Sequence, residues 1–167
     1  MEPTTDRVFL DIARSRLTVH LTGQIRACLE VLNDQQIWWR ANESSNAVGN
    51  LVLHCVGSTR HYIGHIVGNR DFARDRDAEF AERREIAAAE LRARLDLGVA
   101  EADEVLAEFD PARLLEETDR TPEPSTFLQV IGMQLVHYAT HTGQIVFATK
   151  LLKADALDDV WKRTPGH

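Results

Sequence analysis

Apolar residues recur every three or four positions along most of this 167-residue chain, and this spacing limits the fold more than any other feature. The spacing puts apolar side chains on one face of an amphipathic helix. No stretch alternates apolar and polar residues as a half-buried strand does, and no Asn-Gly or Asp-Gly pair marks a hairpin turn. The sequence therefore predicts an all-α fold, an up-and-down four-helix bundle, with residues 1–167 forming a single domain. The four predicted helices span residues 6–32, 44–68, 82–109 and 125–152.

The start of the second helix and two of the connections have distinct compositions. Ser44 or Ser45 is the predicted N-cap of the second helix, because its hydroxyl can accept a bond from a free backbone N–H. Residues 110–124 contain three of the chain's prolines and read as a long connection. Residues 70–80 alternate acidic and basic side chains around two phenylalanines. We interpret this segment as a solvated loop with weak local ion pairs, against the alternative that it lines a site.

Composition narrows the classes of partner and compartment. The chain is 44% hydrophobic and 27% charged, which is typical of a globular domain with a sizeable core. Its formal net charge of -7 disfavours nucleic acids and anionic membranes as partners. No apolar run is long enough for a membrane-spanning helix, and the N-terminal residues lack the pattern of a signal peptide. Cys28 and Cys55 fall on apolar helical faces. We therefore expect a cytoplasmic protein with buried, reduced thiols.

His137 and His141 are the first candidates for chemistry, because they lie four residues apart in the last predicted helix. On a helix they project from the same side, at a spacing that lets both imidazoles bind one metal ion. A single histidine on an apolar face is usually a hydrogen-bonded core residue, but each of a pair would need its own buried partner. The second helix offers a third ligand, and spacing leaves the choice between His54, His61 and His65 open.

Three motifs resemble the DinB-like superfamily, a group of bacterial four-helix proteins with proposed metal sites. They run from Asn50 to Arg60 (NLVLHCVGSTR), from Arg74 to Phe80 (RDRDAEF) and from His137 to Ile145 (HYATHTGQI). The branch with the greatest similarity is known mainly as a domain of unknown function. The resemblance implies a metal triad of one histidine on the second helix and the pair on the last helix, which selects His54, His137 and His141. It also implies a homodimer.

Three imidazole ligands leave a coordination position open, as in catalytic rather than structural zinc sites. The ion could be zinc, nickel, iron or manganese. Characterised relatives include thiol-dependent transferases and an isomerase, so we expect a metal-dependent hydrolase or thiol transferase that acts on an unidentified small molecule. Arg60, His61 and Tyr138 are the candidate catalytic residues. The alternatives are a non-catalytic or stress-linked metal-binding protein and a dimeric scaffold.

Overall fold

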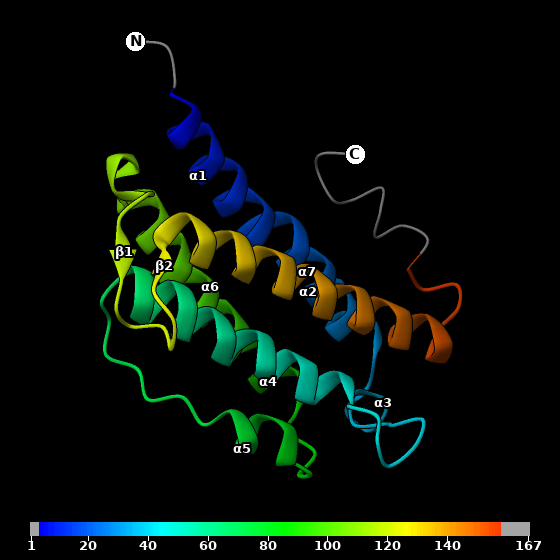
Figure 1. Ribbon diagram of the computed structural model, residues 1–167. Helices are drawn as coiled ribbons and strands as arrows, with labels where there is room; N and C mark the ends of the chain where they lie inside the picture. The colour runs from blue at the N-terminus through cyan, green and yellow to red at the C-terminus, as the bar shows by residue number, and fades with distance from the viewer. Residues whose placement is uncertain (1–3, 158–167) are drawn as a thin grey trace.

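The computed structural model describes residues 4–157, and its regular structure is almost entirely helical. The first long helical stretch joins α1, the π-helical segment η1 and α2, and the second joins α4 and the π-helical segment η2 (Figure 1). The third and fourth are α6 and α7. This confirms the all-α class. The long elements are α1 (Thr5–Ser15), η1 (Arg16–Leu21), α2 (Thr22–Val31), α4 (Val48–Thr59), η2 (Arg60–Val67), α6 (Ala88–Glu108) and α7 (Phe127–Leu152).

Short elements occupy the connections. The expectation of no strands needs one correction, because β1 and β2 form a two-residue antiparallel pair in which Thr118 lies opposite Ser125. This pair folds the proline-rich connection back on itself before α7 begins. A capping box between Thr126 and Gln129 then starts α7. The short elements are α3 (Asp34–Ile37), α5 (Arg76–Ala81), the 3₁₀ turn η3 (Pro111–Arg113), β1 (Glu117–Thr118) and β2 (Ser125–Thr126).

The second predicted helix begins later than expected. It starts at Val48 with Ala47 as its N-cap, so the prediction of Ser44 or Ser45 as the cap is wrong. Both serines bond to the side-chain oxygen of Asn42 instead, at 3.0 Å. Serine and asparagine side chains readily form such local bonds, which compete with helix formation. The loop that they stabilise carries the chain to Ala47.

The third predicted helix also begins later, at Ala88 rather than at residue 82. The Glu82 carboxylate accepts bonds from the backbone N–H groups of Arg83 and Arg84, at 2.9 and 2.8 Å. These bonds hold a turn where the prediction had the first turn of a helix. The N–H of Ala88 is satisfied by the Asp34 carboxylate at 2.8 Å, which marks the true start of α6.

Helix directions differ from the up-and-down prediction. In the middle of α6, Gly98 lies against Val56 of α4. Farther along both helices, Val105 lies against Gly68 at the end of η2. Residue numbers rise together along this contact, so α4–η2 and α6 run parallel. The prediction of four alternating directions is therefore wrong, because the second and third long stretches point the same way.

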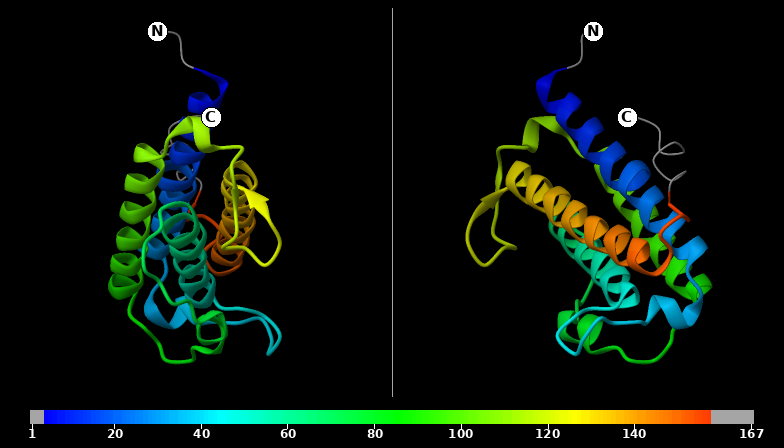
Figure 2. Two further views of the ribbon diagram at one scale, coloured as in Figure 1. Left: turned by 60° about the vertical axis from the view of Figure 1, so that its left-hand side comes forward. Right: turned by 90° about the vertical axis from the view of Figure 1, so that its right-hand side faces the viewer.

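A parallel pair needs a connection that returns along the whole length of the first helix. Residues 70–87 make this return, and they pass beside α4 with α5 in their course (Figures 1 and 2). We call residues 70–87 the strap. By contrast, α4 and α7 run antiparallel, because His54 contacts His137 while Ser58 contacts Gln134. The strap and α7 therefore both lie against α4, and both contact His54 near the middle of that helix.

Two clusters of buried apolar side chains fill the space between the long stretches. One includes Ile25, Val52 and Tyr138, and the other includes Leu10, Ile63 and Ile131. Within residues 4–157, no helix is both long enough and apolar enough to cross a membrane.

Candidate metal centre

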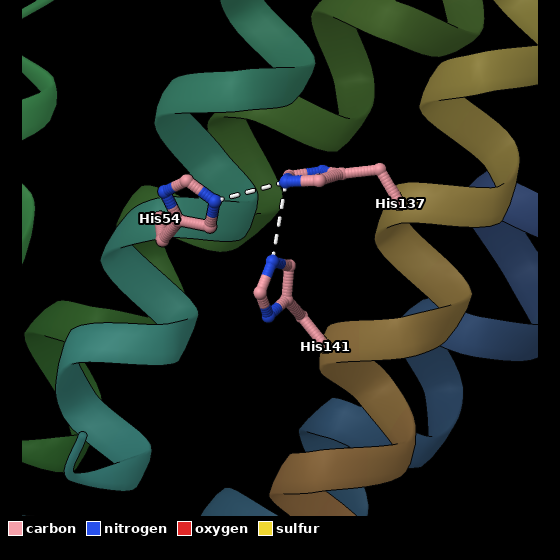
Figure 3. Close-up of side chains that lie close together, drawn as sticks. All are labelled: His54, His137 and His141. Atoms are coloured by element: carbon pink, nitrogen blue, oxygen red, sulfur yellow. Dashed lines mark hydrogen bonds between the residues drawn. The ribbon is translucent and has the colours of Figure 1, made fainter. Parts of the chain in front are cut away.

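Three histidine side chains converge where α4 packs against α7 (Figure 3). The Nε2 atom of His137 lies 2.9 Å from Nε2 of His54 and 3.1 Å from Nε2 of His141. One nitrogen from each ring lies within 4.8 Å of the others. The structure therefore brings together the three residues that the family resemblance selects. Neither His61 nor His65 belongs to this group.

His54 is fixed in one orientation by a carboxylate that the sequence prediction missed. Its side chain is almost fully buried, at 4% exposed, and its Nδ1 atom lies 2.7 Å from Oε2 of Glu79. A carboxylate accepts hydrogen bonds, so Nδ1 carries the proton and donates it to Glu79. The Nε2 atom of a neutral His54 ring therefore carries a free lone pair, which points at His137. The ring of Phe80 covers His54 at a centroid distance of 4.5 Å.

His141 is oriented in the same way by a neutral side chain. Its Nδ1 atom donates to Oε1 of Gln144 at 2.7 Å, which leaves Nε2 as a second lone pair aimed at His137. Gln144 thus holds the His141 ring in one orientation. Gln134, one turn before His137 on the same helix, gives no such support: it is buried and donates to the hydroxyls of Ser58 and Thr59.

His137 lies between these two lone pairs and has no supporting partner. Its Nδ1 atom is buried and has no hydrogen-bond partner among the described residues. Burial, the largest cause, and the charges of the neighbouring His141, His54, Arg74 and Arg76 together lower the pKa of His137 to about 4. The neutral ring can donate from Nε2 to only one neighbouring lone pair at a time, so one close nitrogen pair stays unsatisfied.

A cation fits this arrangement better than a proton does. An ion between the three Nε2 atoms would satisfy all three lone pairs at once. Tetrahedral zinc with nitrogen ligands at ~2.0–2.1 Å holds those nitrogens about 3.3 Å apart. The two separations from His137, 2.9 and 3.1 Å, need to widen by a few tenths of an ångström, and all three nitrogens already lie within 4.8 Å of one another. The donor set, three imidazoles, suits zinc, nickel, iron or copper better than magnesium or calcium.

The interpretation of residues 70–80 as a solvated loop is wrong for two of its side chains. Arg74 and Glu79 are 11% and 10% exposed, and two parallel bonds of 2.8 and 2.9 Å join them. Burial alone would raise the pKa of Glu79, but the hydrogen bonds from His54 and Arg74 outweigh it and lower that pKa below its ordinary value. Glu79 is therefore an ionised carboxylate behind the candidate metal centre.

Two of the three candidate catalytic residues are engaged elsewhere. Tyr138 is fully buried, and its hydroxyl donates to the Thr22 hydroxyl on α2 at 2.8 Å, because Thr22 gives its own proton to the carbonyl of Leu17. Burial raises the pKa of Tyr138 far above its ordinary value. Arg60 pairs with Glu101 of α6 at 3.0 Å, and its guanidinium lies 4.4 Å from the centre of the Phe72 ring. Neither contact involves the three histidines.

His61, the third candidate catalytic residue, lies two turns beyond His54 on the same helical stretch. Its ring stacks on His65 at 5.8 Å, and its Nδ1 atom is buried with no partner among the described residues. Burial lowers its pKa, and Arg74 adds to the effect. Of the three candidates, His61 is therefore the one whose pKa is lowered by Arg74, a residue beside the metal centre.

The thiols take no part in the three-histidine group. Cys28 and Cys55 are both free and buried, as the sequence predicts. Burial raises the pKa of Cys28 to about 11, partly offset by a hydrogen bond with Thr149, and burial raises the pKa of Cys55 still more.

The helical fold and its three-histidine cluster together define a protein with a candidate metal centre between two helices. The chain belongs to the family described as "Protein of unknown function (DUF1572)", whose sequence model matches residues 4–162. A comparison with curated proteins gave no match.

Proposed function

We propose that this protein binds one divalent transition-metal ion through His54, His137 and His141, and that it is a metal-dependent enzyme acting on a small molecule. The observation that carries the proposal is the convergence of three Nε2 atoms, two of which are bare lone pairs because other side chains hold the Nδ1 protons. We further propose that the four long helical stretches are a DinB-like four-helix bundle, with one crossover connection in place of an up-and-down path.

A bound ion with open positions would supply a Lewis acid able to activate a water or a thiol near neutral pH. The chain's own residues hold the donor atoms in place. Glu79 and Gln144 keep the protons on the outer nitrogens of His54 and His141, so both rings present lone pairs without rearrangement. Phe80 covers one side of His54 and limits the access of water there. The two reactions that this arrangement suits are hydrolysis and thiol transfer.

A second candidate function is metal binding without catalysis. The observation that favours it is the engagement of Arg60 and Tyr138 in other contacts, which leaves no free acid or base from these two beside the histidines. Glu79 is also occupied, because it accepts from both His54 and Arg74. An activity screen of the zinc-loaded, nickel-loaded, iron-loaded and manganese-loaded protein, with and without low-molecular-weight thiols, separates the two functions. Turnover with any of these ions supports the enzyme.

Metal content measured for single alanine variants tests the site itself. We expect His54→Ala, His137→Ala and His141→Ala each to lose the ion while they keep their helix content. His61→Ala and His65→Ala are the matched controls, since both residues are half-buried histidines on the same helical stretch as His54. If a control variant loses the ion and His54→Ala retains it, the ligand assignment is wrong. If the wild-type protein binds no metal on titration, the proposed function fails.

We also propose that the protein is a homodimer. The family resemblance motivates this proposal, and the outer face of α7 supports it. From Phe127 to Thr149 this helix contains no aspartate, glutamate, lysine or arginine. Met133, Val136 and Phe147 are exposed on it. An apolar helix face open to water is typical of a surface that binds another protein.

A further inference from the structure

The strap is fastened to α4 directly behind His54. Asn50, one turn before His54, is 1% exposed, and its side-chain amide donates to the backbone carbonyls of Glu79 at 3.0 Å and Glu82 at 3.1 Å. A longer bond of 3.5 Å reaches the carbonyl of Phe80. One buried side chain of α4 therefore fixes the strap backbone on both sides of Phe80, and the end of α5 cannot slide along the helix without breaking these bonds.

The Glu79 side chain fits a place on α4 that only glycine leaves open. A Cβ atom added to Gly57 would lie 1.9 Å from Oε1 of Glu79, so the carboxylate rests on the bare backbone of this residue. From there Oε2 reaches His54, while Arg74 holds both carboxylate oxygens from the strap side. Three independent features, Asn50, Gly57 and Arg74, thus determine where one carboxylate lies.

We infer that Glu79 is a positioning residue that orients His54 for metal binding, and that the bound metal in turn fastens the strap to α4. This inference rests on the proposed function. A carboxylate on the outer nitrogen of a metal-binding histidine fixes its tautomer and increases its basicity, and losing such a partner typically costs about 10- to 100-fold in metal affinity. Linkage is reciprocal, so whatever the Glu79 contact adds to metal affinity, the metal adds to the stability of that contact.

Arg74 keeps this carboxylate ionised without competing for His54. Its Nη2 atom lies 3.2 Å from Nδ1 of His54, but Nδ1 already carries a proton for Glu79 and cannot accept another. Arg74 therefore acts on His54 only through Glu79. Its charge offsets the cost of burying the carboxylate, which would otherwise favour protonation and the loss of its acceptor role.

Glu101 offers a matched control within the same chain. It is 12% exposed, pairs with Arg60 at 3.0 Å, and rests on Gly64 as Glu79 rests on Gly57. At both sites a buried carboxylate pairs with an arginine and lies against the backbone of a glycine. Glu101 differs in that it has no histidine contact, and its arginine partner is more exposed than Arg74, at 31% against 11%.

The test measures the affinity for Zn²⁺ alone by competition with a chromophoric chelator, and the d–d spectrum with Co²⁺. We expect Glu79→Gln to weaken zinc binding about 10- to 100-fold and to alter the Co²⁺ spectrum, since His54 loses its charged partner. Glu101→Gln should leave both unchanged. Gly57→Ala is the second variant: its new methyl group should push the carboxylate off His54, and it should weaken binding in the same direction as Glu79→Gln.

Hydrogen exchange of the strap provides the second readout. Zn²⁺ should slow amide exchange over residues 74–82 in the wild-type protein and in Glu101→Gln, and should slow it less in Glu79→Gln. Wild-type affinity in both Glu79→Gln and Gly57→Ala would overturn the inference and leave the metal site intact. Equal weakening by Glu101→Gln would also overturn it, because a general loss of packing would then explain the effect. Failure of the wild-type protein to bind zinc would instead refute the proposed function.

Discussion

His54 and His137 are 83 positions apart in the chain, yet their Nε2 atoms lie 2.9 Å apart across the contact between α4 and α7. Two imidazole nitrogens at this distance need a proton or a cation between them. A metal ion that binds here connects α4 to α7 in the folded state only. Its binding energy therefore adds to the stability of the fold.

The first prediction follows from this linkage. With free Zn²⁺ at a hundred times its dissociation constant, the wild-type protein should gain about 2.7 kcal/mol of stability. For a domain of this size that corresponds to an increase of roughly 5–11 °C in the melting temperature. His137→Ala should show no increase at the same zinc concentration, whereas His65→Ala should respond as the wild-type protein does. Differential scanning calorimetry makes the comparison, and an equal shift in His137→Ala would count against the site.

The second prediction concerns acid and the metal-free protein. His137 has a pKa of about 4 in the fold and an ordinary value near 6.5 in the unfolded chain, so the unfolded chain takes up its proton first as the pH falls. The stability that the neutral ring contributes is present above pH 6.5 and is lost as the pH falls toward 4. The urea midpoint, measured with a chelator present, should decrease over this range.

The control for this prediction is His137→Ala, which lacks the titrating group. Burial also lowers the pKa values of His141 and His61, so some pH dependence should remain in the variant. We expect its midpoint to fall less steeply than that of the wild-type protein between pH 6.5 and pH 4. Equal slopes would mean that His137 titrates normally in the fold.

The third prediction separates a structural role for Tyr138 from a catalytic one. Tyr138→Phe removes the bond to Thr22 but keeps the buried ring, so it should cost about 0.5–1.5 kcal/mol of stability. Zinc affinity should not change, because the hydroxyl contacts α2 rather than the histidines. Tyr62→Phe, at the chain's other tyrosine, is the control for both measurements. A loss of zinc affinity in Tyr138→Phe alone would place Tyr138 in the metal site.

The fourth prediction tests the proposed homodimer. Val136→Asp puts a charge on the apolar outer face of α7, where it should oppose association by costly desolvation. Sedimentation equilibrium should then give a mass near the monomer value of 18.8 kDa. Leu97→Asp is the control, because Leu97 is an equally exposed apolar residue on α6. A wild-type protein that sediments as a monomer at micromolar concentration would refute the homodimer.

Periodicity alone predicted the helical class and the pairing of His137 with His141, because both depend on which residues share a helix face. It could not choose between His54, His61 and His65. That choice depends on which turn of α4 meets α7, and hence on the packing of the whole molecule. The family resemblance supplied the information that spacing lacked.

Glu79 and the direction of α6 were missed for different reasons. In residues 70–80 every charge looks alike in sequence, and nothing there marks Arg74 and Glu79 as the pair that is buried. The direction of α6 left no signal in the lengths of the connections. Antiparallel helices need connections of only about 2–8 residues, and the predicted gap between the second and third helices, residues 69–81, was longer than that. The predicted gap at residues 110–124 was just as long, yet α6 and α7 run antiparallel.

Asn50, His54, Gly57, Arg74 and Glu79 all lie within a stretch that ends more than 40 residues before α7 begins. During synthesis this stretch leaves the ribosome well ahead of His137 and His141. Contacts between residues close in sequence form with a lower entropic cost than distant ones. We expect His54 to acquire its carboxylate partner early, so that the last helix docks against a ring whose orientation is already fixed. The residues that orient His54 would then assemble before the two ligands on α7 arrive.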